Sequence, residues 1–171
     1  MQGVGKAWIA CVALALLGAC APALDWREVR TEGGVLTAWL PCKPQRRMRE
    51  VELAGSKVSM EMLGCRAADS TWGLTGADVG EPARVEPALA ALRQARSENL
   101  GAPPSAVSDV ELAGRRATRL RIAGHGAEGQ AVVEHSLIFA SGTRVFHLAV
   151  IGAEPGTDAL DAFFGQLRLA R

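Results

Sequence analysis

The chain contains no tyrosine, and phenylalanine and tryptophan together make up 5% of its 171 residues. Surfaces that bind nucleic-acid bases or sugars rely on stacked aromatic rings, so this composition argues against such a platform. An excess of one charge is also lacking, because 19 Lys and Arg residues face 18 Asp and Glu residues. Nucleic-acid-binding domains carry a clear basic surplus, and we therefore predict no nucleic-acid partner.

Motifs of known catalytic and cofactor sites are also missing. The sequence has no G-x-S-x-G, H-E-x-x-H or P-loop, and its acidic residues are scattered, so no catalytic set can be assembled. No C-x-x-C or Cys/His cluster offers a metal site. Residues 124–129 match G-x-G-x-x-G, but a strand pattern follows them where a dinucleotide site needs a helix. We expect a hairpin loop there, and no enzyme activity, cofactor or metal.

The N-terminus has the order of an export signal. Lys6 precedes an apolar segment over residues 7–17, and two small residues, Gly18 and Ala19, follow it. Spanning a bilayer takes about 20 apolar residues. The segment is therefore interpreted as a signal peptide and not as a membrane-spanning helix.

The tetrapeptide Leu17-Gly18-Ala19-Cys20 resembles the lipobox of bacterial lipoproteins. The resemblance implies cleavage before Cys20 and acylation of this residue, and two or more acyl chains anchor a protein stably. In that family the residue after the cysteine influences sorting, and Ala21 at this place favours the outer membrane, with the protein facing the periplasm. An ordinary secretory signal cleaved after Ala19, Ala21 or Ala23 is the alternative.

This interpretation divides the chain into a signal peptide (1–19), a short tether (20–24) and a single α+β domain (25–171). Without residues 1–19 the chain loses one basic residue, Lys6, so its basic and acidic residues become equal in number. Four extended residues span about 14 Å, which keeps the domain close to its anchor. Cys42 and Cys65 remain in an oxidising compartment and are predicted to form a disulfide.

The pattern of apolar residues predicts mostly strands. Gly33-Gly34 and residues 54–56 indicate two hairpins, and Gly101 with two following prolines indicates the end of a helix. We predict strands at 26–31, 35–41, 48–53, 57–63, 71–75, 107–112, 116–122, 130–139 and 144–152, a helix at 82–100, and a second helix beginning at Thr157 as N-cap.

The last two predicted strands are apolar on both faces. A tight turn at Ser141-Gly142 would place Phe139 opposite Arg144 and would send His135 and His147 to opposite faces of the sheet. A sheet that is apolar on both faces needs cover on both sides, and we expect helices to supply it. The two histidines should then share no metal.

The order of these elements, together with the stretch VLTAWLPCKP at residues 35–44, resembles the Mog1/PsbP-like fold found in small bacterial lipoproteins. The resemblance implies an antiparallel sheet with helices packed on it, an α/β/α sandwich. Members of that family are mostly non-enzymatic binding or assembly factors, so the resemblance implies a role of that class and provides no site residue.

Two basic clusters are candidate contacts for an acidic protein partner or for anionic lipid. One comprises Lys43, Arg46, Arg47 and Arg49 around the first cysteine of the predicted disulfide, and the other comprises Arg115, Arg116, Arg119 and Arg121. Charges on a solvated edge strand are the alternative explanation for both clusters. We thus expect a membrane-anchored envelope module that recruits a protein partner. The second hypothesis is a domain that binds a small ligand or lipid in a cavity between the sheet and the alanine-rich first helix.

Overall fold

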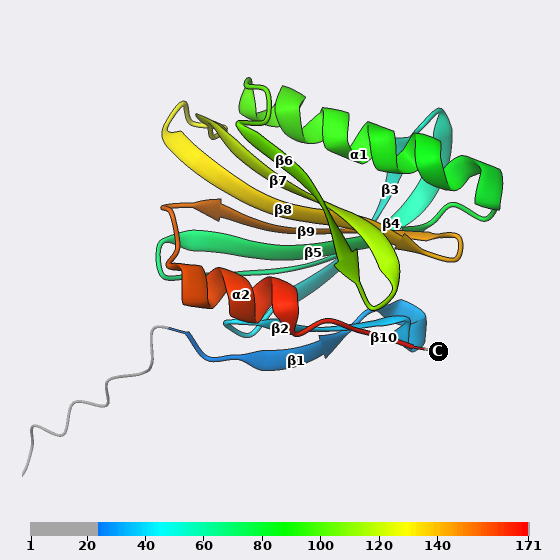
Figure 1. Ribbon diagram of the computed structural model, residues 1–171, viewed down its shortest axis with the longest axis horizontal. Helices are drawn as coiled ribbons and strands as arrows, with labels where there is room; N and C mark the ends of the chain where they lie inside the picture. Colours follow the sequence, from blue (N-terminus) through cyan, green and yellow to red (C-terminus); the bar gives the residue numbers. More distant parts are fainter. Residues whose placement is uncertain (1–23, 171) are drawn as a thin grey trace, which may run out of the picture.

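The computed structural model describes residues 24–170, and Figure 1 shows the arrangement of their elements. The predicted signal peptide, the lipidation site Cys20 and all of the tether except Leu24 lie outside the described residues. The elements in chain order are β1 (Arg27–Arg30), η1 (Glu32–Gly34), β2 (Leu36–Leu40), β3 (Gln45–Leu53), β4 (Ser56–Ala67), β5 (Ser70–Asp78), η2 (Pro82–Arg84), α1 (Val85–Leu100), β6 (Ala106–Leu112), β7 (Arg115–His125), β8 (Ala131–Ser141), β9 (Arg144–Gly152), α2 (Thr157–Gly165) and β10 (Arg168–Leu169).

A large antiparallel sheet forms the centre of the molecule. Its seven strands lie in the order β3-β4-β5-β9-β8-β7-β6. Two meanders, β3-β4-β5 and β6-β7-β8-β9, are joined through α1, and β9 returns to pair with β5. The last strands of the two meanders, β5 and β9, therefore lie side by side within the sheet. Their first strands, β3 and β6, form its edges.

A second, three-stranded sheet contains β1, β2 and β10. The predicted hairpin at Gly33-Gly34 is confirmed, since β1 and β2 are antiparallel neighbours across η1. Strand β10 was not predicted; it has two residues and pairs with the other side of β2. Leu36, Ala38 and Leu40 of β2 are fully buried, so this small sheet has one face in the core.

The predicted α/β/α sandwich is wrong. The described chain is mostly β, with 54% strand and 21% helix, and it has two antiparallel sheets with two α-helices. Helix α1 covers one face of the large sheet, and the other face meets α2 together with the small sheet (Figure 1). The large sheet is apolar on both faces and is covered on both, as expected. On the face of α2, however, much of the cover comes from alternating apolar residues of strand β2 and not from a helix.

Each face of the large sheet has its own hydrophobic core. On the side of α2, the core is built around Trp72 and Phe163, whose rings meet edge to face with centroids 5.2 Å apart. On the side of α1, Ala88 and Leu92 of the helix pack with Leu120, Ile138 and Val145 of the sheet. Buried area of this kind is the main stabilising contribution to the fold.

The register of β8 and β9 differs from the prediction by two residues. Phe139 is opposite Phe146, because the turn is formed by Gly142 and Thr143 between the paired residues Ser141 and Arg144. Gly142 has a φ of 61°, which suits glycine in such a turn. A two-residue shift leaves every side chain on its predicted face, so the apolar faces were correctly assigned.

Both helices form close to their predicted positions. A 3-10 turn at Pro82–Arg84 precedes α1, and Gly101 ends α1 in the left-handed conformation, with φ 63°. The N-cap of α2 is Gly156, one residue before the predicted Thr157. Leu167 lies beyond the end of α2 and is buried there, so the apolar stripe continues past the helix.

The predicted disulfide between Cys42 and Cys65 is present, with a Cα–Cα distance of 5.9 Å. Cys42 follows β2, and Cys65 lies within β4, where it is opposite Trp72 of β5. The bond therefore ties the end of the small sheet to the large one.

Candidate functional site

A groove with a volume of about 700 Å³ runs between α1 and the outer strands of the large sheet. Its volume lies within the range of about 300–1,000 Å³ that is usual for ligand sites. The lining residues come from the first half of α1, from β6, β7 and β8, and from the β6–β7 turn: Val85, Glu86, Leu89, Arg93, Val107, Asp109, Gly114, Arg115, Arg116, Thr118, Ile138 and Ala140.

The groove exists because α1 lies over the inner strands and leaves β6 uncovered. The helix contacts β7, β8, β9 and β3, whereas no residue of β6 is buried. Leu89 and Ala140 are half-buried in the groove, and Val107 of β6 is 62% exposed. Apolar surface is therefore left open between the helix and the edge strand.

The charges around the groove are of both signs and only partly paired. Arg93 and Glu86, both on α1, form an ion pair of 3.2 Å. Asp109 accepts a hydrogen bond of 3.4 Å from the Thr118 hydroxyl on β7, and the described part of the chain gives its carboxylate no ion-pair partner. The groove therefore carries one carboxylate, Asp109, and two arginines, Arg115 and Arg116, that form no ion pair within the described residues.

A buried polar cluster fixes the second half of α1 to the sheet. Glu134 on β8 is fully buried, and Arg96 of α1 donates to its oxygens Oε1 and Oε2 from Nε over 2.9 and 3.1 Å. The Ser136 hydroxyl also donates to Oε1 of Glu134. His147 Nε2 lies 3.0 Å from Ser136 Oγ, an arrangement in which the imidazole donates to the hydroxyl.

Electrostatics keep this cluster charged at Glu134. Burial alone would raise the pKa of the Glu134 carboxyl, but hydrogen bonds from His147 and Arg96 and the charge of Arg96 outweigh it, and the pKa falls to about 2. Burial lowers the pKa of His147 below its usual value, so the imidazole stays neutral near pH 7. The ion pair Arg96–Glu134 thus persists over the physiological range.

The residue types Glu134, Ser136 and His147 are those of a nucleophilic triad, but their geometry is different. A triad places the acid at Nδ1 of the histidine and the serine at Nε2. Here Nε2 faces both residues, at 3.0 Å from Ser136 Oγ and 3.6 Å from Glu134 Oε1. Ser136 is also fully buried. The geometry of the cluster therefore fits a structural role, which is to hold α1 against the large sheet. This cluster was not predicted from the sequence, where its signal is an acid, Glu134, between apolar segments of its strand.

The three arginines of the first predicted basic cluster lie on the edge strand β3. Arg46 forms an ion pair with Glu61, which is 5% exposed, and donates to the Arg30 carbonyl over 2.6 Å. Arg47 donates to its near neighbour Gln45 over 3.2 Å, and Arg49 is exposed. The edge-strand interpretation therefore fits the position of this cluster.

Arg46 and Glu61 belong to a polar joint between the two sheets. Glu61 also accepts a hydrogen bond of 2.7 Å from the backbone of Glu32 in η1, and Arg144 of β9 donates to the Glu32 carbonyl over 2.8 Å. A cavity of about 160 Å³ lies at this joint. These contacts join the two sheets. The charged groups of Arg46, Glu61 and Arg144 are therefore engaged in holding the fold together.

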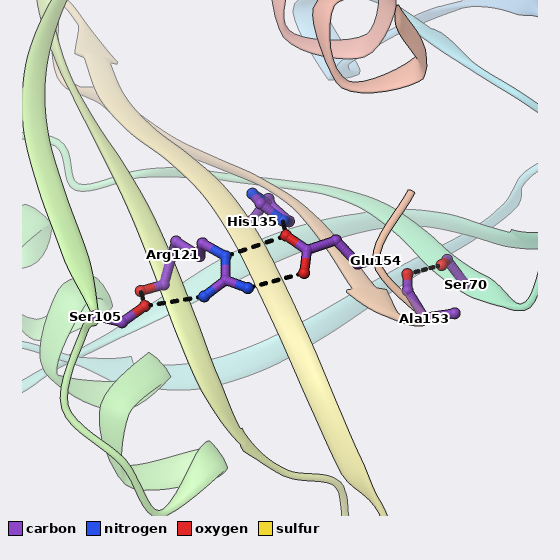
Figure 2. Close-up of polar contacts among 6 residues, drawn as sticks. All are labelled: Ser70, Ser105, Arg121, His135, Ala153 and Glu154. Carbon is purple, nitrogen blue, oxygen red and sulfur yellow. Dashed lines mark hydrogen bonds and ion pairs between the residues drawn. The ribbon is translucent and has the colours of Figure 1, made fainter. Parts of the chain in front are cut away.

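The second predicted cluster does not lie on an edge, because β7 is enclosed by β6 and β8. The guanidinium of Arg119 stacks over the Phe164 ring of α2 at 5.1 Å. Arg121 is bidentate to Glu154, with hydrogen bonds of 3.2 and 2.8 Å (Figure 2). Strands β4, β5, β9 and β8 separate the two basic clusters. The structure therefore does not unite them in one basic surface.

Figure 2 shows how these contacts hold the loop after β9. Glu154 accepts from Arg121, and His135 Nε2 lies 3.2 Å from its Oε1. The hydrogen bond from Arg121 is also the main reason why the pKa of the Glu154 carboxyl is lowered. Next to it, the Ser70 hydroxyl donates to the Ala153 carbonyl over 2.9 Å. As predicted, His135 and His147 face opposite sides of the sheet.

The chain enters the described structure near one end of the large sheet, on the face opposite to the groove. The amide of Asp25 donates to the Pro41 carbonyl over 2.8 Å, next to the disulfide. In the large sheet this end carries Ala67 and Gly152, whereas the groove residues Arg116 and Ala140 lie toward the other end of the strands. The groove thus extends from Val107, one position from the row of Cys65, toward the far end of the strands. It lies on the α1 face of the large sheet, whereas Leu24 and Trp26 pack on the other face.

Within residues 24–170, no helix has the length and apolar character needed to cross a membrane. In the same residues, no group of three or more His, Cys, Asp or Glu side chains is arranged to hold a metal ion.

Comparisons with known proteins give a fold and no family. No protein-family model and no curated protein matches the chain. A crystal structure of a protein from Bacteroides thetaiotaomicron is similar, with a TM-score of 0.54 and 9% sequence identity over 86% of this chain and 50% of that chain. The chain therefore spans about half the length of that protein, and the likeness concerns the fold alone.

Proposed function

We propose that the protein is a lipid-anchored envelope module that binds a protein partner without catalysing a reaction. Acylated Cys20 would hold it in the membrane, facing the periplasm and, by the residue at position 21, in the outer membrane. The proposal is supported by the lipobox and by the disulfide Cys42–Cys65, a bond typical of proteins outside the cytoplasm.

The observation that carries the proposal is the opposite placement of the chain entry and the groove. A tether of four residues reaches about 14 Å, so the end of the domain near Asp25 would lie against the membrane. The groove between α1 and β6 would then open away from the lipid surface. A surface in this position is accessible to a protein in the periplasm while the module itself stays anchored.

Membrane fractionation and crosslinking in cells test this proposal together. The wild-type chain should sediment with membranes, and the Cys20→Ser variant should be released. A photo-crosslinking residue at Val107 in the groove should yield a discrete protein adduct. The same residue at Glu128, which is exposed in the β7–β8 loop at the entry end, serves as the matched control and should not. A Cys20→Ser chain that stays in the membrane, or equal adducts from both positions, would contradict the proposal.

The groove also favours a second candidate, a site for a small ligand or lipid. Its volume of about 700 Å³ suits such a molecule, and its apolar lining includes Leu89 of the alanine-rich helix α1 and Ile138 of β8. Native mass spectrometry of the protein isolated from membranes tests this alternative. A retained small molecule that is lost on replacing Leu89 with arginine would support it, and ligand-free spectra of the native protein would count against it.

A further inference from the structure

The two edges of the large sheet are built differently. Edge strand β3 carries three exposed arginines, Arg46, Arg47 and Arg49. Charged side chains on an edge, lysine and arginine especially, discourage pairing with another chain. Edge strand β6 has the sequence AVSDVEL, with no Lys, Arg or Pro. One edge thus carries three cations, whereas the other carries two carboxylates, Asp109 and Glu111, and no cation.

Strand β6 is also open along its outer side. Its one neighbour in the sheet is β7, so one row of backbone N–H and C=O groups faces outward. Residues 106–109 are all exposed. An added strand would lie about 4.8 Å from β6 and would use these backbone groups.

The groove lies beside this open edge. Val107 and Asp109 of β6 both line it, because residues two apart in a strand share one face. A strand added to β6 would therefore send every second side chain toward α1, where Leu89 and Val85 leave apolar surface open. Backbone pairing would provide affinity, and the groove would select side chains, as in other cases of strand addition.

The charges of β6 indicate which side chains fit. Val107 is apolar and 62% exposed. Asp109 has a hydroxyl, Thr118, as its cross-strand neighbour, and no cation in the described residues pairs with it. Glu111 has Arg116 opposite it in the register, and Arg115 and Arg116 line the groove from the side of β7, whereas an added strand would face Asp109 from the outer side of β6. Opposite charges on directly facing strand residues stabilise a pair, so Asp109 calls for a basic side chain on an added strand.

We propose that β6 is a strand-pairing edge that takes an extended segment of a partner protein, bearing an apolar side chain and a basic side chain two residues apart. The apolar side chain lies against Val107 and the basic one against Asp109. The inference rests on the proposed function in one respect, which is that the partner is a protein of the cell envelope.

Peptide binding to the full-length acylated protein in detergent tests the pairing. The probe is a fluorescent peptide of about eight residues in which valine and lysine alternate with threonine, a length that matches an ordinary strand. A second peptide carries glutamate in place of lysine, and a third carries N-methyl groups on alternate amides. We expect the lysine peptide to bind at least about tenfold more tightly than either of the other two, because they lose the charge pair or the backbone hydrogen bonds.

Variants of β6 make the test specific. Asp109→Lys should reverse the preference between the lysine and glutamate peptides, and Val107→Lys should weaken the lysine peptide about tenfold by placing a charge at the edge. Both positions are exposed, so the variants should keep the fold. Arg49→Lys on the opposite edge is the matched control and should bind as the native chain does. Equal binding of the N-methylated peptide, or an unchanged preference in Asp109→Lys, would overturn the inference.

The outcome is separable from that of the proposed function. If Cys20 is acylated and the groove yields a specific crosslink, but β6 variants leave this crosslink and the peptide affinities unchanged, the strand-pairing inference fails alone. If the chain proves to be unacylated while the peptide preferences follow Asp109, the anchor fails and the pairing edge stands. Displacement of the peptide by a small amphiphile that occupies the groove would identify a ligand site and overturn the pairing.

Discussion

Replacing Arg96 with methionine should destabilise the protein strongly, because it leaves a fully buried carboxylate without its cation. Arg96 of α1 donates two hydrogen bonds from Nε to Glu134, of 2.9 and 3.1 Å, and its side chain is 18% exposed. Methionine keeps much of the length and the apolar contacts of arginine. The variant therefore tests the ion pair, with little change in packing.

The expected loss follows from the burial of the pair. Removing one partner of a buried ion pair costs about 3–5 kcal/mol. Water reaches part of the Arg96 side chain, which places the loss in the free energy of unfolding near the lower end, at about 3 kcal/mol. For a domain of about 150 residues this corresponds to a melting temperature lower by about 6–12 °C. Urea unfolding and calorimetry of the oxidised protein would measure both quantities.

The effect should also depend on pH. In the native chain the pKa of Glu134 is about 2, below its ordinary value of 4.5, so its stabilising contribution is present above pH 4.5 and is lost as the pH falls toward 2. The lowered pKa of His147 acts in the same direction, and its contribution is lost below pH 6.5. Without Arg96, the pKa of Glu134 is higher than in the native chain, because burial favours the neutral carboxyl. Protonation of this carboxyl at lower pH then reduces the destabilisation of the variant. The stability gap between the two chains should therefore narrow as the pH falls below neutral, and it should narrow further below pH 4.5, where the native chain loses the contribution of Glu134.

Arg93→Met is the matched control on the same helix. Arg93 pairs with Glu86, which is 77% exposed, and an exposed pair of this kind contributes less than about 1 kcal/mol. The double variant Arg96→Met/Glu134→Gln removes both charges and keeps an amide for Ser136, so it should be more stable than Arg96→Met alone. A loss in Arg96→Met no larger than that in Arg93→Met, or a gap that does not change with pH, would refute the reasoning.

Three further predictions concern other parts of the fold. The double substitution Cys42→Ser/Cys65→Ser should lower the free energy of unfolding by about 3 kcal/mol, measured by urea unfolding against the oxidised native chain; no change would mean that the loop constraint is unimportant. Gly124→Ala should lower the free energy of unfolding by about 1–3 kcal/mol, since the new Cβ would lie 2.3 Å from the Leu100 carbonyl oxygen at the end of α1. An unchanged melting temperature would show that the end of α1 moves aside at no cost. Arg121→Ala should lower the melting temperature only slightly, and this effect should fade in high salt, because its ion pair is largely exposed; a large loss that salt does not reduce would contradict this.

The elements that the sequence predicted well are those with local signals. Gly101 before two prolines marks the end of α1, and Gly33-Gly34 marks the first hairpin. The sides of β8 and β9 were also predicted, since the alternation of apolar residues survives a register shift of two. The disulfide was predicted from the number of cysteines and the expected compartment, without any knowledge of distance.

The elements that were missed depend on contacts between distant segments. Strand β10 has two residues and pairs with β2 at the other end of the chain, so no local pattern announces it. The α/β/α prediction failed because the first hairpin, β1–β2, joins β10 in a second sheet that packs on the large one. Glu134 is an acid between apolar segments of its strand, and its cation, Arg96, is 38 positions away. A cavity between the sheet and the first helix was an alternative hypothesis from the sequence, and the position of the groove beside β6 depends on where α1 crosses the sheet.

The central claim is that an acylated, disulfide-bonded chain presents its groove from the membrane, and the intact mass of the protein from the membrane fraction tests it most directly. We predict a mass equal to residues 20–171 plus acyl groups, which rises by the mass of two hydrogen atoms on reduction as Cys42 and Cys65 separate. An unacylated mass that begins after Ala19, Ala21 or Ala23 would contradict the account and indicate a soluble exported protein.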